Sequence, residues 1–146
     1  AVIPTIITQI ADGAEEIKLG DISPTRDFNY VTDTASAFIK ILNAKKDIYG
    51  ETFNFGSSYQ LSIRDLVMLI GKLMNVDIKI VTDKNRIRPK KSEVMSLLAN
   101  SSKAKKILKW KPIYSGRAGL VDGLKVTIKW FKDNRHLYQN YKKYVK

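Results

Sequence analysis

The spacing of apolar and polar residues changes from one short segment of this chain to the next, and it predicts alternating helices and strands. Isoleucines recur at helical spacing over residues 3–10 and stop at Asp12-Gly13, which predicts a first helix. Residues 16–19 alternate polar and apolar side chains, and residues 26–31 do the same. Each of these two stretches therefore predicts a strand.

The pattern returns to helical spacing after these strands. A second helix is expected to end around Asn43, with Thr32 or Asp33 as its N-cap. Residues 52–55 lie between two glycines and predict a compact strand, and residues 77–81 predict another by alternation.

Three further helices follow from capping signals and apolar stripes. Ser62 with Asp65 forms a variant of the capping box, with aspartate where glutamate is usual, and opens one helix. Asn100 or Ser101 caps a short helix that ends before the first tryptophan, and residues 120–131 form the last. Because strands and helices alternate, the pattern predicts an α/β fold.

Length and composition indicate one globular domain. The chain has 146 residues, 44% of them hydrophobic, which is short for a two-domain oxidoreductase. No apolar run approaches the roughly 20 residues that cross a bilayer, and no basic-then-apolar leader opens the chain. We therefore expect no membrane partner and a cytoplasmic location. The chain opens at Ala1 directly into a helical pattern, as a piece of a longer protein would.

Several kinds of chemistry are excluded by residue type. There is no cysteine, so disulfides, thiolate metal sites and cysteine nucleophiles are ruled out. The single histidine, His136, excludes histidine-pair metal sites. Acidic pairs such as Glu15-Glu16 have no evident nucleophile beside them. We therefore predict no metal site and no catalytic residue.

The net charge of +12 would attract any polyanion. It makes a basic nucleic-acid-binding module the alternative function, and Tyr138, Tyr141 and Tyr144 among lysines could stack on bases. Against that alternative, the basic residues are spread over several predicted elements and match no nucleic-acid-binding motif.

Two arginine motifs carry the most specific signal. Residues 26–33 have the sequence Arg-Asp-Phe-Asn-Tyr-Val-Thr-Asp, and residues 88–94 have the sequence Arg-Pro-Lys-Lys-Ser-Glu-Val. A guanidinium is a planar fork of donors that can hold two phosphate oxygens. A lone arginine is more often a solvated surface charge, but these longer patterns are more specific than one residue.

With the capped helix and the Trp-Lys-Pro at residues 110–112, these motifs resemble one family. This family is the extended short-chain dehydrogenases/reductases, which include the NAD-dependent sugar epimerases and dehydratases. Within it, the motifs most resemble those of nucleotide-sugar 4,6-dehydratases. The resemblance implies that Arg26 contacts the diphosphate, Arg88 a phosphate or ribose, and Glu93 the ribose hydroxyls. It also implies that Val2 opens a helix lining the nucleotide pocket.

The dinucleotide-binding half of that family has no counterpart here. Gly116, Gly119 and Gly123 are irregularly spaced and follow no strand, so they do not form its phosphate-binding turn. Tyr138 and Lys142 match the catalytic Tyr-x-x-x-Lys spacing, but no cofactor site lies beside them and the pair is interpreted as accidental. This chain alone is expected to bind no cofactor and to be inactive, with NAD held by the parent enzyme.

The resemblance therefore implies a small mixed α/β substrate-binding lobe, lacking most of the Rossmann domain. The lobe would span residues 1–134 and a basic Lys/Tyr-rich tail residues 135–146. Its expected partners are a UDP- or GDP-sugar and the missing Rossmann half. Residues 2–10 and 28–42 would pack on that half, and exposing them predicts self-association.

Overall fold

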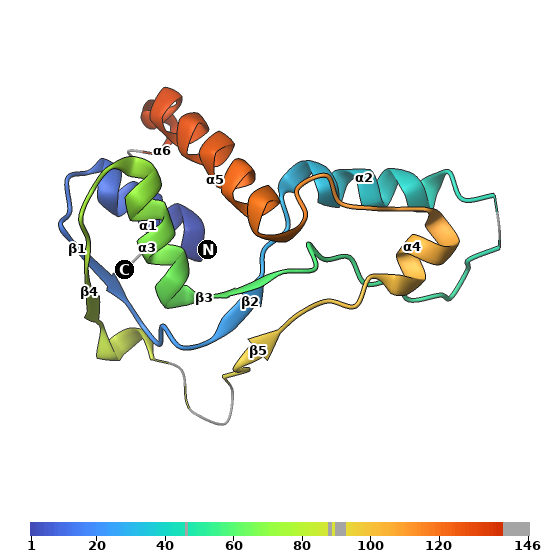
Figure 1. The fold of residues 1–146 in the computed structure, drawn as a ribbon, viewed down its shortest axis with the longest axis horizontal. Helices are drawn as coiled ribbons and strands as arrows, with labels where there is room; N and C mark the ends of the chain where they lie inside the picture. The colour runs from blue at the N-terminus through green and yellow to red at the C-terminus, as the bar shows by residue number, and fades with distance from the viewer. Residues whose placement is uncertain (46, 88, 90–92, 139–146) are drawn as a thin grey trace.

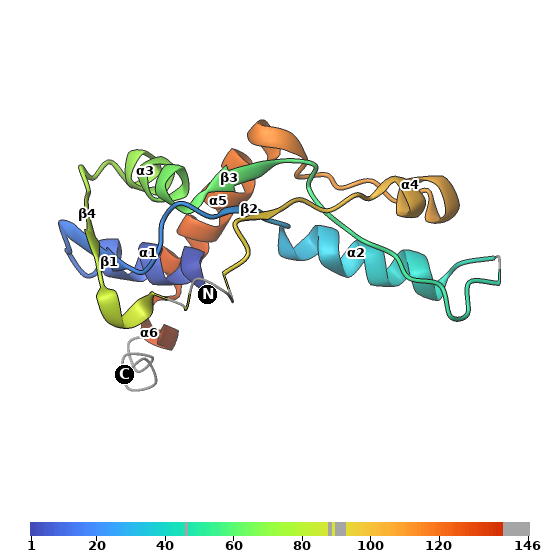
Figure 2. The same ribbon diagram turned by 90° about the horizontal axis from the view of Figure 1, so that it is seen from below.

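The computed structural model describes residues 1–45, 47–87, 89 and 93–138, and Figure 1 shows an elongated molecule. One end carries α1, α3, β1 and β4, the other carries α2 and α4, and a small sheet lies between them, as Figure 2 confirms from below. The predicted α/β class is confirmed: helices and two small sheets alternate along the described chain.

The first sheet and its helices form the larger core. Strands β1 (Glu16–Leu19) and β4 (Lys79–Thr82) pair in parallel, and helices α1 (Val2–Ala11), α3 (Ile63–Met74) and α5 (Gly116–Asp133) pack with them. Ile6 and Ile7 of α1 are fully buried in this core. The isoleucine face of residues 2–10, expected to pack on the missing half, packs instead against α3 and α5 of this chain.

The second sheet has three very short strands. Strand β2 (Thr25–Asp27) lies between β3 (Gln60–Ser62), which runs antiparallel, and β5 (Ser96–Leu97), which runs parallel. The sheet thus brings together segments about 35 and 70 residues apart in sequence, in keeping with the non-local pairing of sheets.

A smaller core lies at the other end, between α2 (Val31–Leu42) and α4 (Ser102–Leu108). Trp110 is 2% exposed there and packs with Ala37, Ala104 and Leu108. Its indole Nε1 donates to Ser36 Oγ at 2.9 Å, which satisfies the polar atom of a buried tryptophan. The second tryptophan, Trp130 in the C-terminal half of the chain, is by contrast half exposed.

Asp33 does not cap its helix as predicted. The N-cap of α2 is Tyr30, and Asp33 lies in the first turn, 1% exposed. Its two carboxylate oxygens accept hydrogen bonds from the backbone N–H groups of Ile113 and Tyr114, at 2.8 and 2.9 Å. The side chain therefore ties α2 to the segment before α5, a distant partner that local sequence cannot reveal.

Other boundaries differ from expectation by a few residues. The strand predicted over 26–31 is confined to β2, because helix α2 already begins at Val31. Residues 52–55 form no strand at all, and the strand predicted at 77–81 is found as β4, two residues later at its start. The Ser62 cap is confirmed, since its hydroxyl accepts from the backbone N–H of Asp65.

The remaining elements complete the chain. A single 3-10 turn, η1, covers Lys84–Arg86, and α6 (Arg135–Tyr138) follows α5 within the segment predicted to be a tail. Ser101 stands at the N-cap of α4 without a side-chain capping bond, while Asn100 Oδ1 accepts from the backbone N–H of Ser102. Among the helices of the described residues, none is both long and apolar enough to span a bilayer.

Helix α2 leaves large apolar side chains uncovered. Four of them are at least 57% exposed and form what we call the α2 apolar face: Val31, Phe38, Ile39 and Leu42. The helical stripe predicted over this segment is present, but within the described residues it faces away from both cores.

Candidate substrate-binding site

The candidate site is built on the central strand of the small sheet. Arg26 lies opposite Leu61 of β3 and Leu97 of β5, so both neighbours hold its backbone in place. Its guanidinium Nη1 donates to the carbonyl of Thr25 at 2.9 Å. Strand β2 and the Thr25 carbonyl thus orient the guanidinium group of Arg26.

Arg26 and Glu93 form an ion pair. Arg26 Nη2 donates to Glu93 Oε1 at 2.6 Å, and the two side chains are 22% and 14% exposed. The sequence predicted both as ligand groups, and the structure brings them together although they are 67 positions apart in the sequence. A guanidinium has five N–H donors, more than its two contacts here use, so Arg26 can hold a phosphate oxygen while Glu93 orients it.

Asp27 anchors the site from the opposite face of the strand. Its Oδ1 accepts from the backbone N–H of Ser57 at 2.8 Å and from the Ser57 hydroxyl at 2.6 Å, while Oδ2 accepts from the N–H of Ala99 at 3.3 Å. Successive residues of a strand point to opposite faces, so Asp27 stabilises the scaffold while Arg26 serves the site. Sequence reasoning gave Asp27 no role, although it lies inside the first arginine motif.

Gly56 makes the close approach around Asp27 possible. A Cβ at this position would lie 2.4 Å from Asp27 Oδ2 and 2.5 Å from the Ala99 Cβ. Its N–H donates to Ser101 Oγ at 2.9 Å, which connects the same turn to the start of α4. The glycine that follows the predicted strand at 52–55 is thus required by packing.

The other two predicted site residues are placed differently. Val2 lies in the first turn of α1, half-buried, and packs against the larger core, so its predicted place beside a nucleotide stays a prediction. Arg88 lies outside the described residues. Of the predicted set, the structure therefore brings together Arg26 and Glu93.

Two glycines of α5 serve packing. A Cβ on Gly119 would lie 2.2 Å from the backbone of Tyr114, and one on Gly123 would lie 3.1 Å from the Tyr30 ring. They allow α5 to approach the Tyr30–Tyr114 ring pair closely. Among the described residues, no group of three or more His, Cys, Asp or Glu side chains could hold a metal ion.

A mixed α/β unit with the two arginine motifs, at residues 26–33 and 88–94, is typical of one class of protein, the extended short-chain dehydrogenases/reductases. The solved structure of UDP-glucuronic acid 4-epimerase from Bacillus cereus, in complex with UDP-glucuronic acid and NAD, matches 91% of this chain with a TM-score of 0.79 and 28% identity. The match covers 40% of that epimerase chain.

The sequence identifies the family within this class. The profile of the GDP-mannose 4,6-dehydratase family matches residues 1–122, and the chain belongs to that family. A putative UDP-glucose 4-epimerase of Methanocaldococcus jannaschii is 31% identical over 133 residues, covering 91% of this chain and 39% of the relative. The human dTDP-D-glucose 4,6-dehydratase is 28% identical over 146 residues, covering 97% and 39%. The chain therefore spans about two fifths of the length of these relatives.

Proposed function

We propose that this chain is the nucleotide-sugar-binding part of an NAD-dependent nucleotide-sugar 4,6-dehydratase or epimerase. The observation that carries the proposal is the Arg26–Glu93 ion pair, which joins the diphosphate-binding candidate on β2 to the ribose-binding candidate. The relatives are nucleotide-sugar dehydratases and epimerases, which supports the same kind of ligand.

Arg26 and Glu93 would contact different parts of the nucleotide. The Arg26 guanidinium would neutralise the diphosphate and donate hydrogen bonds to its oxygens. The Glu93 carboxylate would accept hydrogen bonds from the ribose hydroxyls while holding the guanidinium in register. Val2 and Arg88 remain part of this proposal, as the pocket-lining residue and the second phosphate contact.

Catalysis would belong to the rest of the enzyme. NAD, bound there, would supply the hydride chemistry of the sugar ring. The residues of this chain would take no part in the chemical steps. The chain would instead bind and orient the substrate and offset its charge. By itself it is therefore expected to bind a sugar nucleotide without turning it over.

The α2 apolar face would meet the rest of the enzyme. Phe38 and Leu42 are 69% and 83% exposed, and exposed apolar surface of this kind generally marks an interaction site. Since the chain spans about two fifths of its relatives, the remainder of the full-length enzyme is the partner we propose for this face. Without that partner, the same face would drive the self-association expected from the sequence.

Calorimetric titration tests the proposal. The chain is titrated with a UDP-sugar, a GDP-sugar and a random oligonucleotide, each at low and at physiological salt. Saturable binding of one sugar nucleotide, weakened in Arg88→Ala, is the expected result. Oligonucleotide binding alone, collapsing steeply with salt, would instead identify a basic nucleic-acid-binding module and contradict the proposal.

A further inference from the structure

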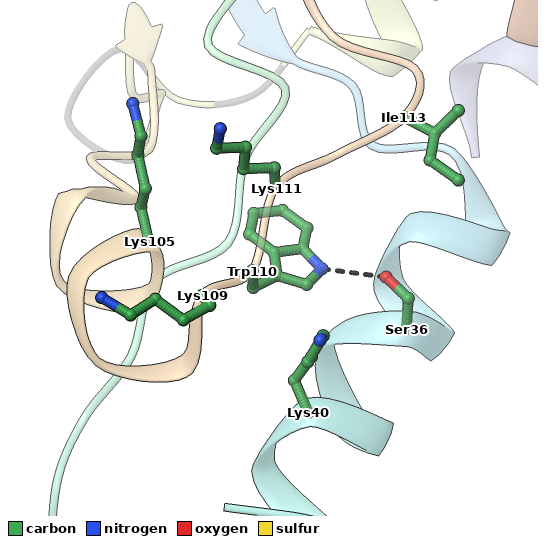
Figure 3. A pocket seen from close by; sticks show the side chains of 7 residues that line it. All are labelled: Ser36, Lys40, Lys105, Lys109, Trp110, Lys111 and Ile113. Carbon is green, nitrogen blue, oxygen red and sulfur yellow. Dashed lines mark hydrogen bonds between the residues drawn. The ribbon is translucent and has the colours of Figure 1, made fainter.

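A second cationic site lies around Trp110, apart from the Arg26–Glu93 pair. A pocket of about 680 Å³ is lined by seven residues: Ser36, Lys40, Lys105, Lys109, Trp110, Lys111 and Ile113. Four of the seven are lysines and none is acidic. In Figure 3, Lys105 lies on α4, Lys109 lies at the C-terminal end of α4, and Lys40 lies on α2. Trp110 lies between these two helices.

Among the described residues, none of the four lysines of this pocket forms a salt bridge with a carboxylate. The buried carboxylate of Asp33 lies beside the lining, where it accepts hydrogen bonds from the backbone N–H groups of Ile113 and Tyr114. Glu51 pairs with Lys103, which lies outside the lining. Like charges gathered on one concave surface repel one another and raise the local concentration of anions.

The chemistry of the lining selects the class of anion. Ammonium groups are compact point charges that suit phosphate oxygens, and no guanidinium is present to favour a planar partner. Trp110 is 2% exposed and its indole N–H is already bound to Ser36, so the ring offers no face on which a base could stack. These features favour a compact, multiply charged phosphate over a nucleic-acid strand, which would use exposed aromatic rings.

The pocket stays open when the α2 apolar face is covered. Ser36 and Lys40 are four residues apart and share one side of α2. At 3.6 residues per turn, the α2 apolar face lies roughly 140° around the helix from them. A partner seated on that face would therefore leave the lysines accessible. Figures 1 and 2 also place α4 away from β2 and β5, the strands beside the Arg26–Glu93 pair.

We propose that the lysine-lined pocket around Trp110 binds a phosphate-rich anion, such as a polyphosphate chain, at a site separate from the nucleotide-sugar site. A second hollow shares Lys105, Trp110 and Lys111 with it and adds serine hydroxyls, among them Ser102 and Ser115. These hydroxyls could donate to further phosphate oxygens, which would extend the site along the α4–α5 connection.

Titration of the chain with inorganic tripolyphosphate tests this proposal. The double variant Lys40→Gln/Lys109→Gln removes two ammonium groups from the pocket and should weaken saturable binding about tenfold. The matched control Lys72→Gln/Lys132→Gln removes two exposed lysines from the last turns of α3 and α5 and should stay within about twofold. Lys40→Arg/Lys109→Arg keeps the charge and should retain binding, and circular dichroism melts check that every variant is folded.

Three results would overturn the proposal. Equal weakening in both glutamine double variants would show diffuse attraction to a basic protein. Loss of tripolyphosphate binding in Arg26→Gln would place the anion at the nucleotide-sugar site. Tighter binding of adenosine triphosphate or of an oligonucleotide than of tripolyphosphate would show that a base is recognised, which the buried Trp110 ring does not allow.

Discussion

Asp27 holds Ser57 by two hydrogen bonds, one from the backbone N–H at 2.8 Å and one from the hydroxyl at 2.6 Å. The contact joins the strand that carries Arg26 to the loop before β3. The order of the proposed site therefore depends on a carboxylate that itself faces away from the ligand.

Removing this carboxylate should destabilise the protein. Asp27→Ala leaves the N–H groups of Ser57 and Ala99 without their acceptor, which should cost about 2–3 kcal/mol in the free energy of unfolding. Asp122→Ala is the matched control, because Asp122 is exposed and pairs with the exposed Lys125 on the same helix. It should cost less than about 1 kcal/mol. Chemical denaturation measures both, and equal losses would refute the anchoring role of Asp27.

Self-association should depend on the α2 apolar face. The unmodified chain is expected to form oligomers at micromolar concentration in sedimentation velocity, because four large apolar side chains there lack cover. Phe38→Glu/Leu42→Glu should give monomers. Val126→Glu, on an exposed position of α5, should leave the oligomers intact. A monomeric unmodified chain would contradict this prediction.

Stability should fall in acid through the Glu16–Lys79 pair that links β1 to β4. The hydrogen bond from Lys79 Nζ, at 2.9 Å, lowers the pKa of Glu16 from 4.5. Because the folded pKa lies below the unfolded one, the stabilising contribution is present above pH 4.5 and is lost as the pH falls below it.

Thermal melts of Glu16→Gln across this pH range check the assignment. The variant should lose part of the acid dependence of Tm, while Glu15→Gln, on the neighbouring exposed residue, should keep the dependence of the unmodified chain. The difference should shrink at high salt, because both partners are exposed. An unchanged pH profile in Glu16→Gln would show that the pair makes no contribution.

Local signals in the sequence predicted the helices better than the short strands. The Ser62 cap and the apolar stripe after it are properties of adjacent residues, so α3 begins where expected. The predicted strand at 52–55 has the same local character, yet nothing in the described chain pairs with it. Strand formation needs a partner elsewhere, and the local pattern cannot supply it.

The sequence indicated candidate ligand groups, whose role stays a prediction, and it did not indicate the residues that support them. The motif context singled out Arg26 and Glu93 as ligand groups, and the structure joins them. Asp27 and Asp33 hold backbone groups 30 and 80 positions away, and no spacing rule connects such residues. The lysines around Trp110 likewise come from α2, α4 and the segment after α4, and only the fold gathers them.

The most direct measurement is the affinity of the chain for a sugar nucleotide in Arg26→Gln and in Arg64→Gln. The first substitution removes the proposed diphosphate contact, and the second removes an arginine in the first turn of α3, outside the candidate site. Calorimetry should show binding weakened at least about tenfold in Arg26→Gln and changed less than about twofold in Arg64→Gln, since hydrogen bonds to charged groups contribute about 1.5–3 kcal/mol. Equal affinities in the two variants, or no binding by the unmodified chain, would contradict the account.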